Sequence, residues 1–510
     1  MIQPAYDAFA SGYAEGRAQL LYTRLVADLE TPVSAFLKLG FDNGSGGKDN
    51  AFLLESVQGG ETRGRYSIIG LKPDLIWRCR DGQAEINRAA LHDENKFVTE
   101  TAKPLESLRA LTRETRMVLP AGLPPMATGL FGYLGYDMAR QVENLPHPPP
   151  DTLGLPDAIL LRPTITAIFD SVKDEIIVIT PVWPDKSVDA KAAYARATAR
   201  LDEAVATLEA PAPHPAPTPA DLPTGVAIES NMTKDEYFDV VARAKEYILA
   251  GDVFQVVPSQ RFRRPFALPP FSLYRALRRL NPSPYLYYLA MPGFQIVGSS
   301  PEVLVRLRGG KVTIRPIAGT RPRGKTPEED KALAEDLMAD PKERAEHLML
   351  VDLGRNDVGR VARTGAVTVT DSFFIERYSH VMHLVSNVEG EIRDGLDAVD
   401  ALAAGLPAGT LTGAPKIRAM ELIDEFEKEK RGAAYAGAVG YFAADGSMDT
   451  CIVLRTALVK DGTMYVQAGG GVVADSQPEA EYQETINKSK ALLAAAEEAV
   501  RFASAAKKGQ

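Results

Sequence analysis

A proline-rich segment over residues 210–225 (APAPHPAPTPADLPTG) divides this chain of 510 residues into two large parts. The segment has six prolines and one charged residue, a composition that favours an extended, semi-rigid linker. We therefore expect an N-terminal region over residues 1–209 and a C-terminal region over residues 226–505. Each region is long enough to bury a hydrophobic core of its own.

Short apolar and β-branched runs, separated by glycine, proline and aspartate, predict strands in both regions. These runs cover residues 52–54, 66–69, 164–169, 175–180, 255–257, 295–297, 366–370 and 464–466. Helices are predicted near residues 187–209, 234–250, 328–339, 342–352, 396–404, 416–425 and 478–503. A capping box of Thr233 and Glu236 marks the start of the second helix. Since strands and helices do not alternate regularly, we expect an α+β fold with large antiparallel β-sheets.

Charge and composition exclude several function classes. The chain has 58 basic and 67 acidic residues, a net charge of −9, whereas nucleic acids and anionic membranes require a positive surface. Two charge-free runs, residues 117–136 and 280–301, contain several prolines each, so we interpret them as buried strands and turns. The cysteines Cys79 and Cys451 are too few for a disulfide framework or a cysteine zinc site. With no signal-peptide pattern at Met1, we expect a cytoplasmic protein that binds neither nucleic acid nor membrane.

Two Glu-x-x-Glu pairs lie on predicted helices far apart in the sequence. Glu343 and Glu346 are one turn apart on the helix near 342–352, and Glu481 and Glu484 lie in the first turn of the last helix. Carboxylates are hard oxygen ligands that suit Mg²⁺ better than zinc. The alternative is ordinary solvated helix charge.

A run of glycines and one arginine point to anion binding. Gly469 to Gly471 follow a predicted strand and precede the last helix, so their N–H groups either converge on an anion or form a plain turn. Arg455 lies in the strand-like apolar run 451–456 and needs a partner there. That partner is either a ligand carboxylate or an internal acid.

One histidine and one threonine are further candidates. His383 lies in a His-x-x-His pair with His380, but no third soft metal ligand is nearby. A hydrogen-bonding or acid–base role for His383 and a packed structural role both remain open. Thr410 lies on the Gly- and Pro-rich loop 407–416, where it either faces a ligand or caps a helix.

Motifs spread over nearly the whole chain occur in an order that resembles a known family. They are LLES (53–56), GDVFQVVPSQRF (251–262), NPSPYLYYL (281–289), GSSPE (298–302), IRPIAGTRPRG (314–324), EHLMLVDLGRNDVGRV (346–361), HVMHLVS (380–386), AGTLTGAPKIRAMELI (408–423), GAVGYF (437–442), DTCIVLRTA (449–457) and QAGGGVVADSQPEAEYQETINKSKAL (467–492). The sequence resembles the chorismate-utilising enzymes, and among them the large subunits of anthranilate synthases. We accordingly expect a sandwich-like core of antiparallel sheets, flanked by helices, with the N- and C-terminal regions packed together.

The resemblance implies a role for each candidate residue. Glu346 and Glu484 match direct Mg²⁺ ligands, and Glu343 and Glu481 match carboxylates that hold the waters of a metal bound to the ring carboxylate of chorismate. The groups that match those around the enolpyruvyl carboxylate are Tyr435, Arg455, Gly469 and Gly471. The remaining matches are Glu302 to the general acid that protonates the departing C4 hydroxyl, His383 and Thr410 to residues lining the ring, and Lys488 to a further charged residue.

Two positions bear on which reaction the resemblance implies. Aminodeoxychorismate synthases usually have a lysine in a PIKGT motif, whereas this chain has Ala318 in PIAGT. Isochorismate- and salicylate-forming relatives usually have a water-activating lysine at the position of Gln255, and glutamine cannot act as a base. Attack of ammonia on chorismate, giving anthranilate and pyruvate, is therefore implied. The alternatives are aminodeoxychorismate synthesis and a catalytically silent, tryptophan-sensing paralogue.

The resemblance also implies partners and a regulator. Ammonia is expected from a separate glutamine amidotransferase subunit in a hetero-oligomer, for which we expect a heterotetramer. The residues that match the family's pocket for the inhibitor L-tryptophan are Leu53, Glu55, Ser56, Asn281, Pro282 and Tyr285. The alternative is that these residues form a contact between the two regions.

Overall fold

The computed structural model describes residues 1–42, 46–58, 62–213, 225–378 and 381–506. Most of the predicted linker 210–225, and His380, lie outside these residues. The α-helices are α1 (Tyr6–Ala14), α2 (Pro32–Leu39), α3 (Pro104–Glu114), α4 (Ala190–Glu209), α5 (Lys234–Ala250), α6 (Pro270–Leu280), α7 (Pro327–Ala339), α8 (Pro341–Gly359), α9 (Ala398–Gly405), α10 (Lys416–Phe426) and α11 (Pro478–Ala506). Short 3₁₀ helices are η1 (Pro125–Ala127), η2 (Tyr136–Gln141) and η3 (Gly409–Leu411).

Most strands belong to one antiparallel sheet that folds into two layers. The first layer contains, in order of pairing, β1 (Gln19–Val26), β10 (Glu175–Val182), β9 (Ala158–Asp170), β5 (Thr62–Arg80), β4 (Ala51–Gln58), β14 (Tyr285–Met291), β15 (Phe294–Ser300), β24 (Thr456–Lys460), β25 (Thr463–Gly469), β13 (Ser259–Pro265) and β11 (Glu229–Ser230). The second contains β7 (Val98–Thr99), β6 (Gln83–Asn87), β5 and β9 again, β8 (Gly129–Leu134), β22 (Ala438–Ala443), β23 (Met448–Ile452), β16 (Val303–Arg308), β17 (Lys311–Ile314) with β18 (Ile317–Pro322), β20 (Val381–Glu391) and β19 (Thr368–Arg377). Two short pairs lie apart, β2 (Phe41–Asp42) with β3 (Gly46–Gly47) and β12 (Gln255–Val256) with β21 (Gly413–Ala414).

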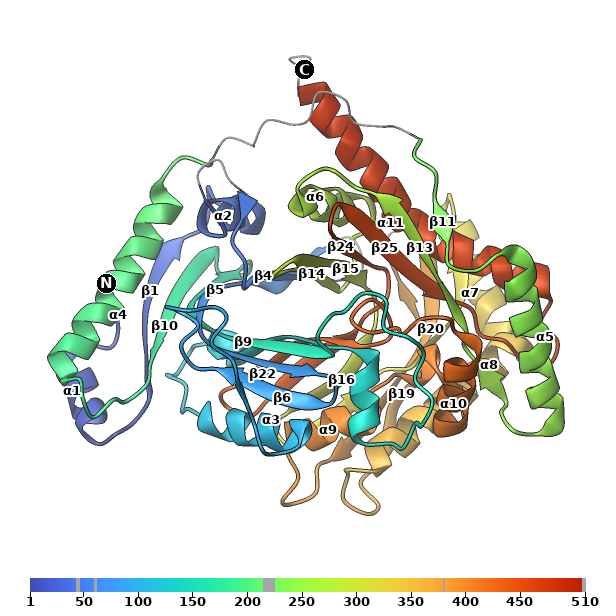
Figure 1. The fold of residues 1–510 in the computed structure, drawn as a ribbon, viewed down its shortest axis with the longest axis horizontal. Coiled ribbons are helices and arrows are strands. Elements are labelled where there is room, and N and C mark those ends of the chain that lie inside the picture. The colour runs from blue at the N-terminus through green and yellow to red at the C-terminus, as the bar shows by residue number, and fades with distance from the viewer. Residues whose placement is uncertain (43–45, 59–61, 214–224, 379–380, 507–510) are drawn as a thin grey trace.

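The layers face each other across an apolar core. Phe52 of β4 stacks on Phe131 of β8 at 4.8 Å between ring centroids, and Tyr133 of β8 meets Phe294 of β15 at 6.1 Å. None of these strand pairs are neighbours in the sheet, so the contacts cross between layers. Helices α1, α2, α4, α6 and α11 pack on the first layer, and α3, α8 and α9 on the second, while α5 packs against α11 and α10 against the pair β12 and β21 (Figure 1). This arrangement confirms the predicted α+β fold with large antiparallel sheets and a sandwich-like core.

Both parts of the chain contribute to both layers. Strand β4 pairs with β14 in the first layer, and β8 pairs with β22 in the second, so each pair joins a strand before the proline-rich segment to one after it. The predicted packing of the N- and C-terminal regions against each other is confirmed. Their boundaries as domains stay a prediction.

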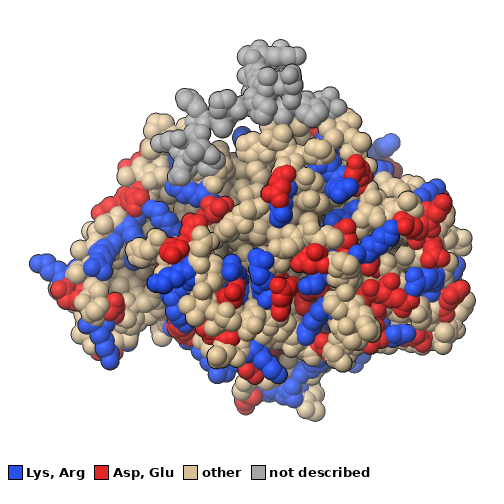
Figure 2. All heavy atoms as spheres, in the orientation of Figure 1, with Lys and Arg blue, Asp and Glu red and all other residues tan. Residues whose placement is uncertain are grey.

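Helix α5 has its predicted bounds and the predicted capping box. Helix α5 begins at Lys234, where the hydroxyl of Thr233 accepts from the backbone N–H of Glu236 and the Glu236 carboxylate accepts from the N–H of Thr233. The charge-free runs contain β8, β14 and β15, and among the described residues no helix is long and apolar enough to cross a membrane. On the face in Figure 2, acidic and basic side chains are interspersed.

One strand prediction is wrong in an informative way. The apolar run 451–456 is not continuous, because β23 ends at Ile452 and β24 begins at Thr456. Between them Arg455 has a φ of 50°, in the left-handed region that non-glycine residues rarely adopt. The left-handed backbone at Arg455 therefore separates β23 from β24.

Candidate active site

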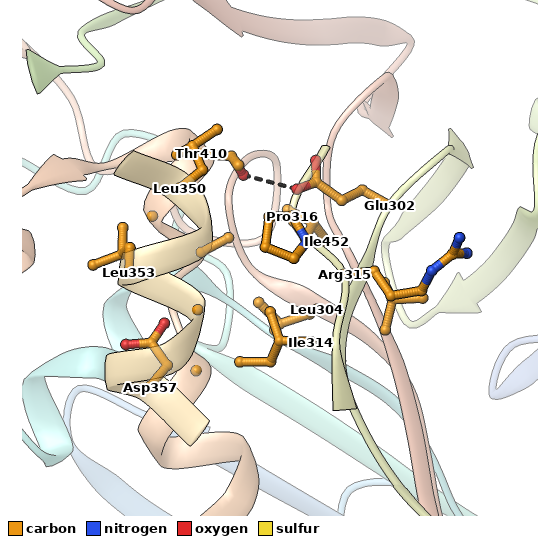
Figure 3. Close-up of a pocket in the computed structure, with 15 residues that line it drawn as sticks. Glu302, Leu304, Ile314, Arg315, Pro316, Leu350, Leu353, Asp357, Thr410 and Ile452 are labelled. Atoms are coloured by element: carbon orange, nitrogen blue, oxygen red, sulfur yellow. Dashed lines mark hydrogen bonds between the residues drawn. The ribbon is translucent and has the colours of Figure 1, made fainter. Parts of the chain in front are cut away.

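A buried carboxyl group, that of Glu302, lies between β15 and β16. The hydroxyl of Thr410, on η3, donates a 3.1 Å hydrogen bond to its Oε1 (Figure 3). Burial raises the pKa of Glu302 to about 8, although Thr410 and the positive charge of Lys488 lower it in part. The group is therefore largely protonated at neutral pH and can act as a general acid.

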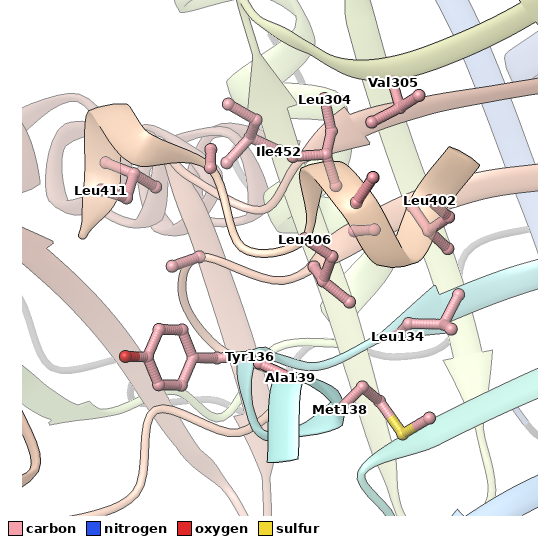
Figure 4. Close-up of a cluster of buried hydrophobic side chains, with 14 of the residues drawn as sticks. Leu134, Tyr136, Met138, Ala139, Leu304, Val305, Leu402, Leu406, Leu411 and Ile452 are labelled. Carbon is pink, nitrogen blue, oxygen red and sulfur yellow. The ribbon is translucent and has the colours of Figure 1, made fainter. Parts of the chain in front are cut away.

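Apolar packing holds this pair in place. The side chains of Leu350 and Leu353 on α8 line the small cavity beside Glu302 together with Ile314, Pro316 and Ile452 (Figure 3). Beneath η3, Leu411 belongs to a larger apolar cluster that includes Leu406 of the preceding loop and Tyr136 (Figure 4). The Thr410 loop therefore rests on a packed base.

Arg455 and Tyr435 form a second part of the site. Among the described residues, no acidic side chain lies within ion-pair distance of Arg455, and burial lowers its pKa. Its electrostatic coupling to Tyr435 and to His383 places these three side chains close together. A partly buried arginine that has no acidic partner among the described residues supports the ligand-carboxylate alternative over the internal ion pair.

The glycine run closes this part of the site. A Cβ on Gly469 would lie 3.0 Å from the Tyr435 hydroxyl and 2.7 Å from the carbonyl oxygen of Pro258. The Nζ of Lys488 donates a 2.9 Å hydrogen bond to the carbonyl of Gly469 and forms a 2.7 Å ion pair with Glu484. There is therefore no room for a side chain at residue 469, the last residue of β25.

The two Glu-x-x-Glu pairs face a common region from α8 and α11. Burial, together with the negative charges of Glu343 and Glu484, raises the pKa of Glu346. Burial and the charge of Glu484 likewise raise the pKa of Glu481, whose carboxylate accepts a 2.7 Å hydrogen bond from Ser476. Repulsion of this kind requires that the pairs lie near each other.

These carboxylates do not form a closed metal site. Glu343 lies 3.4 Å from Arg321, Glu484 is paired with Lys488, and Glu346 has only a 3.5 Å hydrogen bond from Gln255. In the part of the chain that the structure describes, no group of three or more His, Cys, Asp or Glu side chains is suited to hold a metal ion. Magnesium binding stays a prediction.

Comparison with known proteins decides the family. The family model described as chorismate binding enzyme matches residues 50–494. A protein named anthranilate synthase component 1 from Cereibacter sphaeroides is 57% identical over 505 residues, covering 99% of this chain and 100% of that protein. The chain belongs to the chorismate binding enzymes, as an anthranilate synthase large subunit.

Further relatives agree with this family. A protein of the same name from Pseudomonas aeruginosa is 49% identical, covering 95% of this chain and 96% of its own. The crystal structure of anthranilate synthase component I from Streptococcus pneumoniae matches with a TM-score of 0.74 and 37% identity, over 92% of this chain and 99% of that one. A menaquinone-specific isochorismate synthase from Escherichia coli shares the fold, with a TM-score of 0.66 and 18% identity over 96% of this chain and 99% of its own.

Gln255 and Ala318, the two positions predicted to bear on the reaction, are both buried. Gln255 is buried, its Nε2 faces Glu346 at 3.5 Å, and its Oε1 has no hydrogen-bond partner in the structure. A Cβ on Gly471 would lie 2.2 Å from that Nε2, so the absence of a side chain there leaves room for the amide. Ala318 is buried on β18 opposite Leu384.

His383 lies next to Ala318, on β20. Its Nδ1 is 2.9 Å from the carbonyl oxygen of Gly319 and 3.1 Å from the Thr320 hydroxyl. Because a carbonyl only accepts, Nδ1 carries the ring proton, and Nε2 is left as an acceptor. Burial lowers the pKa of His383, which favours this neutral form.

Three of the six residues predicted for tryptophan binding line a separate cavity of about 400 Å³ between the layers. Glu55, Ser56 and Tyr285 line it. Leu53 does not, because neighbouring strand residues face opposite sides, so that Leu53 packs under the helices and Leu54 lines the cavity instead. Asn281 and Pro282 also lie outside the lining, and Pro284 takes their place.

The sequence does not predict the buried ion pair between Glu427 and Arg431. Their side chains are 3% and 1% exposed. The stretch 427–431 (EKEKR) has the composition of a solvated surface turn. Only the spacing of four residues between opposite charges gave a signal, and such spacing is common on exposed helices.

Proposed function

We propose that this chain converts chorismate and ammonia to anthranilate and pyruvate, the first step of tryptophan biosynthesis. The observation that carries the proposal is Glu302, a buried acid whose pKa of about 8 keeps it protonated near neutral pH; a partly buried arginine, Arg455, that has no acidic partner among the described residues supports it. Loss of the C4 hydroxyl of chorismate requires a proton donor, and the enolpyruvyl carboxylate requires a cationic partner. Glu302 and Arg455 supply these two groups.

Each side chain has a distinct task in this proposal. Arg455, Tyr435 and the backbone at Gly469 and Gly471 bind the enolpyruvyl carboxylate and orient the ring. Glu302, held by Thr410, gives its proton to the C4 oxygen, so that the C–O bond breaks and water leaves as the nitrogen adds at C2 and sheds a proton. The aminated ring then loses its C2 proton, the C3–O bond to the enolpyruvyl group breaks, and pyruvate leaves as its methylene carbon takes up a proton. Neutral His383, with Nε2 as an acceptor, fits a position beside the ring.

The chemistry of the donors suits Mg²⁺, because all four are carboxylates. Burial and neighbouring negative charge raise the pKa of Glu346 and of Glu481, and a divalent cation between the two helices would relieve this repulsion. Glu346 and Glu484 would ligate the ion, and Glu343 and Glu481 would hold its waters. When bound, Mg²⁺ supplies a Lewis acid for the ring carboxylate.

The residues at positions 318 and 255 favour ammonia as the nucleophile. Ala318 cannot form a covalent adduct with the ring, and Gln255 cannot deprotonate water, whereas ammonia needs no base. The ammonia would come from a glutamine amidotransferase subunit, in line with the name component 1 of the relatives. We propose a hetero-oligomer, with a heterotetramer as the expected form.

Feedback inhibition by tryptophan is supported by the position of the second cavity. Pro301 and Val303 line it, while Glu302 between them lines the catalytic cavity. Cys451 lines the same cavity, and the N–H of the next residue, Ile452, donates a 3.0 Å hydrogen bond to the Glu302 carbonyl. A molecule bound in this cavity of about 400 Å³ therefore touches the residues on either side of Glu302. Through them, bound tryptophan can change the position of the Glu302 carboxyl group.

The product assay tests this proposal. The purified chain is given chorismate, Mg²⁺ and ammonium, and anthranilate is followed by its fluorescence. We expect product with ammonium, loss of rate when EDTA removes the metal, and no product with glutamine alone. Release of aminodeoxychorismate instead of anthranilate would favour the nearest rival, and a chain that binds tryptophan but forms neither product would favour the silent paralogue.

A further inference from the structure

We infer that Arg431, held by Glu427, is a positioning residue that fixes three separate parts of the active site relative to one another. This inference rests on the function proposed above. Arg431 lines neither the catalytic nor the tryptophan cavity, so it acts through other residues and not on the substrate.

The guanidinium of Arg431 bonds to two backbone carbonyls next to site residues. Its Nη1 donates a 2.6 Å hydrogen bond to the carbonyl of Leu411, the residue after Thr410. Its Nη2 donates a 2.6 Å hydrogen bond to the carbonyl of Val257, two residues after Gln255. The two segments also meet directly, since the N–H of Val257 donates to the carbonyl of Thr412 at 2.9 Å. One side chain thus joins the Thr410 loop to the Gln255 strand.

The third part is the carboxylate-binding end of the site. The Arg431 guanidinium lies 5.2 Å from the centroid of the Tyr435 ring. It lies 4.9 Å from the centroid of the Tyr136 ring. The Tyr435 hydroxyl in turn lies against Gly469, since a Cβ there would be only 3.0 Å from it. Stacking by a cation fixes the plane and position of the phenol ring.

Glu427 holds the arginine and reaches the same end by a second path. Its carboxylate accepts from Nε and Nη2 of Arg431, and its Oε1 also accepts from the N–H and the hydroxyl of Ser259, at 2.9 and 2.6 Å. Ser259 accepts a 2.8 Å hydrogen bond from Gln467 and pairs with Gly469 across β13 and β25. The fork of a guanidinium is needed for this set, because a lysine has no planar arrangement of donors.

The test compares Arg431→Lys with the wild type and with a matched control. Arg162→Lys alters a similar fork, from Arg162 to Asp74, on β9 and away from the site. Folding is checked by circular dichroism and melting temperature. Wild-type formation of anthranilate is measured first, since its absence refutes the proposed function and not this inference.

We expect folded Arg431→Lys to lose at least 10-fold in kcat, with Arg162→Lys near the wild-type rate. Because Thr410 is no longer held against Glu302, the basic limb of the kcat–pH profile should move to higher pH, a change that mere destabilisation does not cause. A wild-type kcat and profile in Arg431→Lys, or an equal loss in Arg162→Lys, overturns the inference.

A second variant covers the case in which Arg431→Lys does not fold. Ser259→Ala keeps the buried ion pair and removes only the hydroxyl that links Glu427 to Gln467. A lowered kcat at a wild-type melting temperature supports the inference, and an unchanged kcat overturns it.

Discussion

Replacing the proposed general acid by its amide, Glu302→Gln, should lower activity strongly and stabilise the fold. Burial raises the pKa of Glu302 from 4.5 to about 8, so the folded protein keeps a proton that the unfolded chain has lost above pH 4.5. A raised carboxyl pKa lowers wild-type stability as pH rises, by about 1.4 kcal/mol per pH unit, until the pH reaches the folded pKa. Glutamine has no such cost.

The expected difference follows from these values. At pH 4.5 the two proteins should be equally stable, and at pH 7 the variant should be about 3 kcal/mol more stable. For a chain of this length, that corresponds to a melting temperature about 3 °C higher. The kcat should fall roughly 10²–10⁴-fold, the usual contribution of a general acid.

Melting temperatures of both proteins between pH 5 and 8, with anthranilate formation in parallel, check this prediction. Glu246→Gln, at an exposed position on α5, is the control and should show neither effect. A melting-temperature difference that stays constant with pH would contradict the raised pKa of Glu302. A Glu302→Gln enzyme with wild-type kcat would contradict its role as general acid.

Three further variants test other parts of the site. Arg455→Met should raise the KM for chorismate about 10- to 100-fold, as expected for loss of a charge-assisted hydrogen bond, and an unchanged KM in a chorismate titration would contradict the assigned role. Gly471→Ala places a Cβ 2.2 Å from Gln255 Nε2 and should lower kcat at least 10-fold in the same assay, whereas Gly359→Ala, with its nearest atom 4.0 Å away, should not; equal rates in both would count against it. Tyr285→Phe removes a 3.0 Å hydrogen bond at the second cavity and should raise the half-inhibiting tryptophan concentration about 5- to 10-fold at an unchanged basal rate. Inhibition curves that superimpose with the wild type would exclude that cavity.

Local signals in the sequence were sufficient for much of the fold. Thr233 and Glu236 specify the start of α5 by a short-range capping interaction, which needs no tertiary context. The starts of α8 and α11, which carry the four glutamates, likewise lie within one residue of their predictions, whereas α8 continues to Gly359, seven residues past its predicted end. The family, and with it the positions of Glu302 and Thr410, followed from motif order.

Properties that depend on tertiary structure were harder to predict. The apolar run 451–456 contains no glycine or proline, so nothing local indicates the left-handed Arg455 that interrupts it. Whether Leu53 or Leu54 faces a cavity depends on the register of β4 against β14. Glu427 and Arg431 read as surface charge, because their burial is decided by segments far away in the sequence.

The most direct test of the proposed chemistry is the fate of nitrogen in a reaction with ¹⁵N-ammonium. The purified chain is incubated with chorismate, Mg²⁺ and the labelled ammonium, and the product is identified by mass spectrometry. We expect anthranilate that carries one ¹⁵N atom, released together with pyruvate. Unlabelled isochorismate, labelled aminodeoxychorismate, or unconverted chorismate would contradict it.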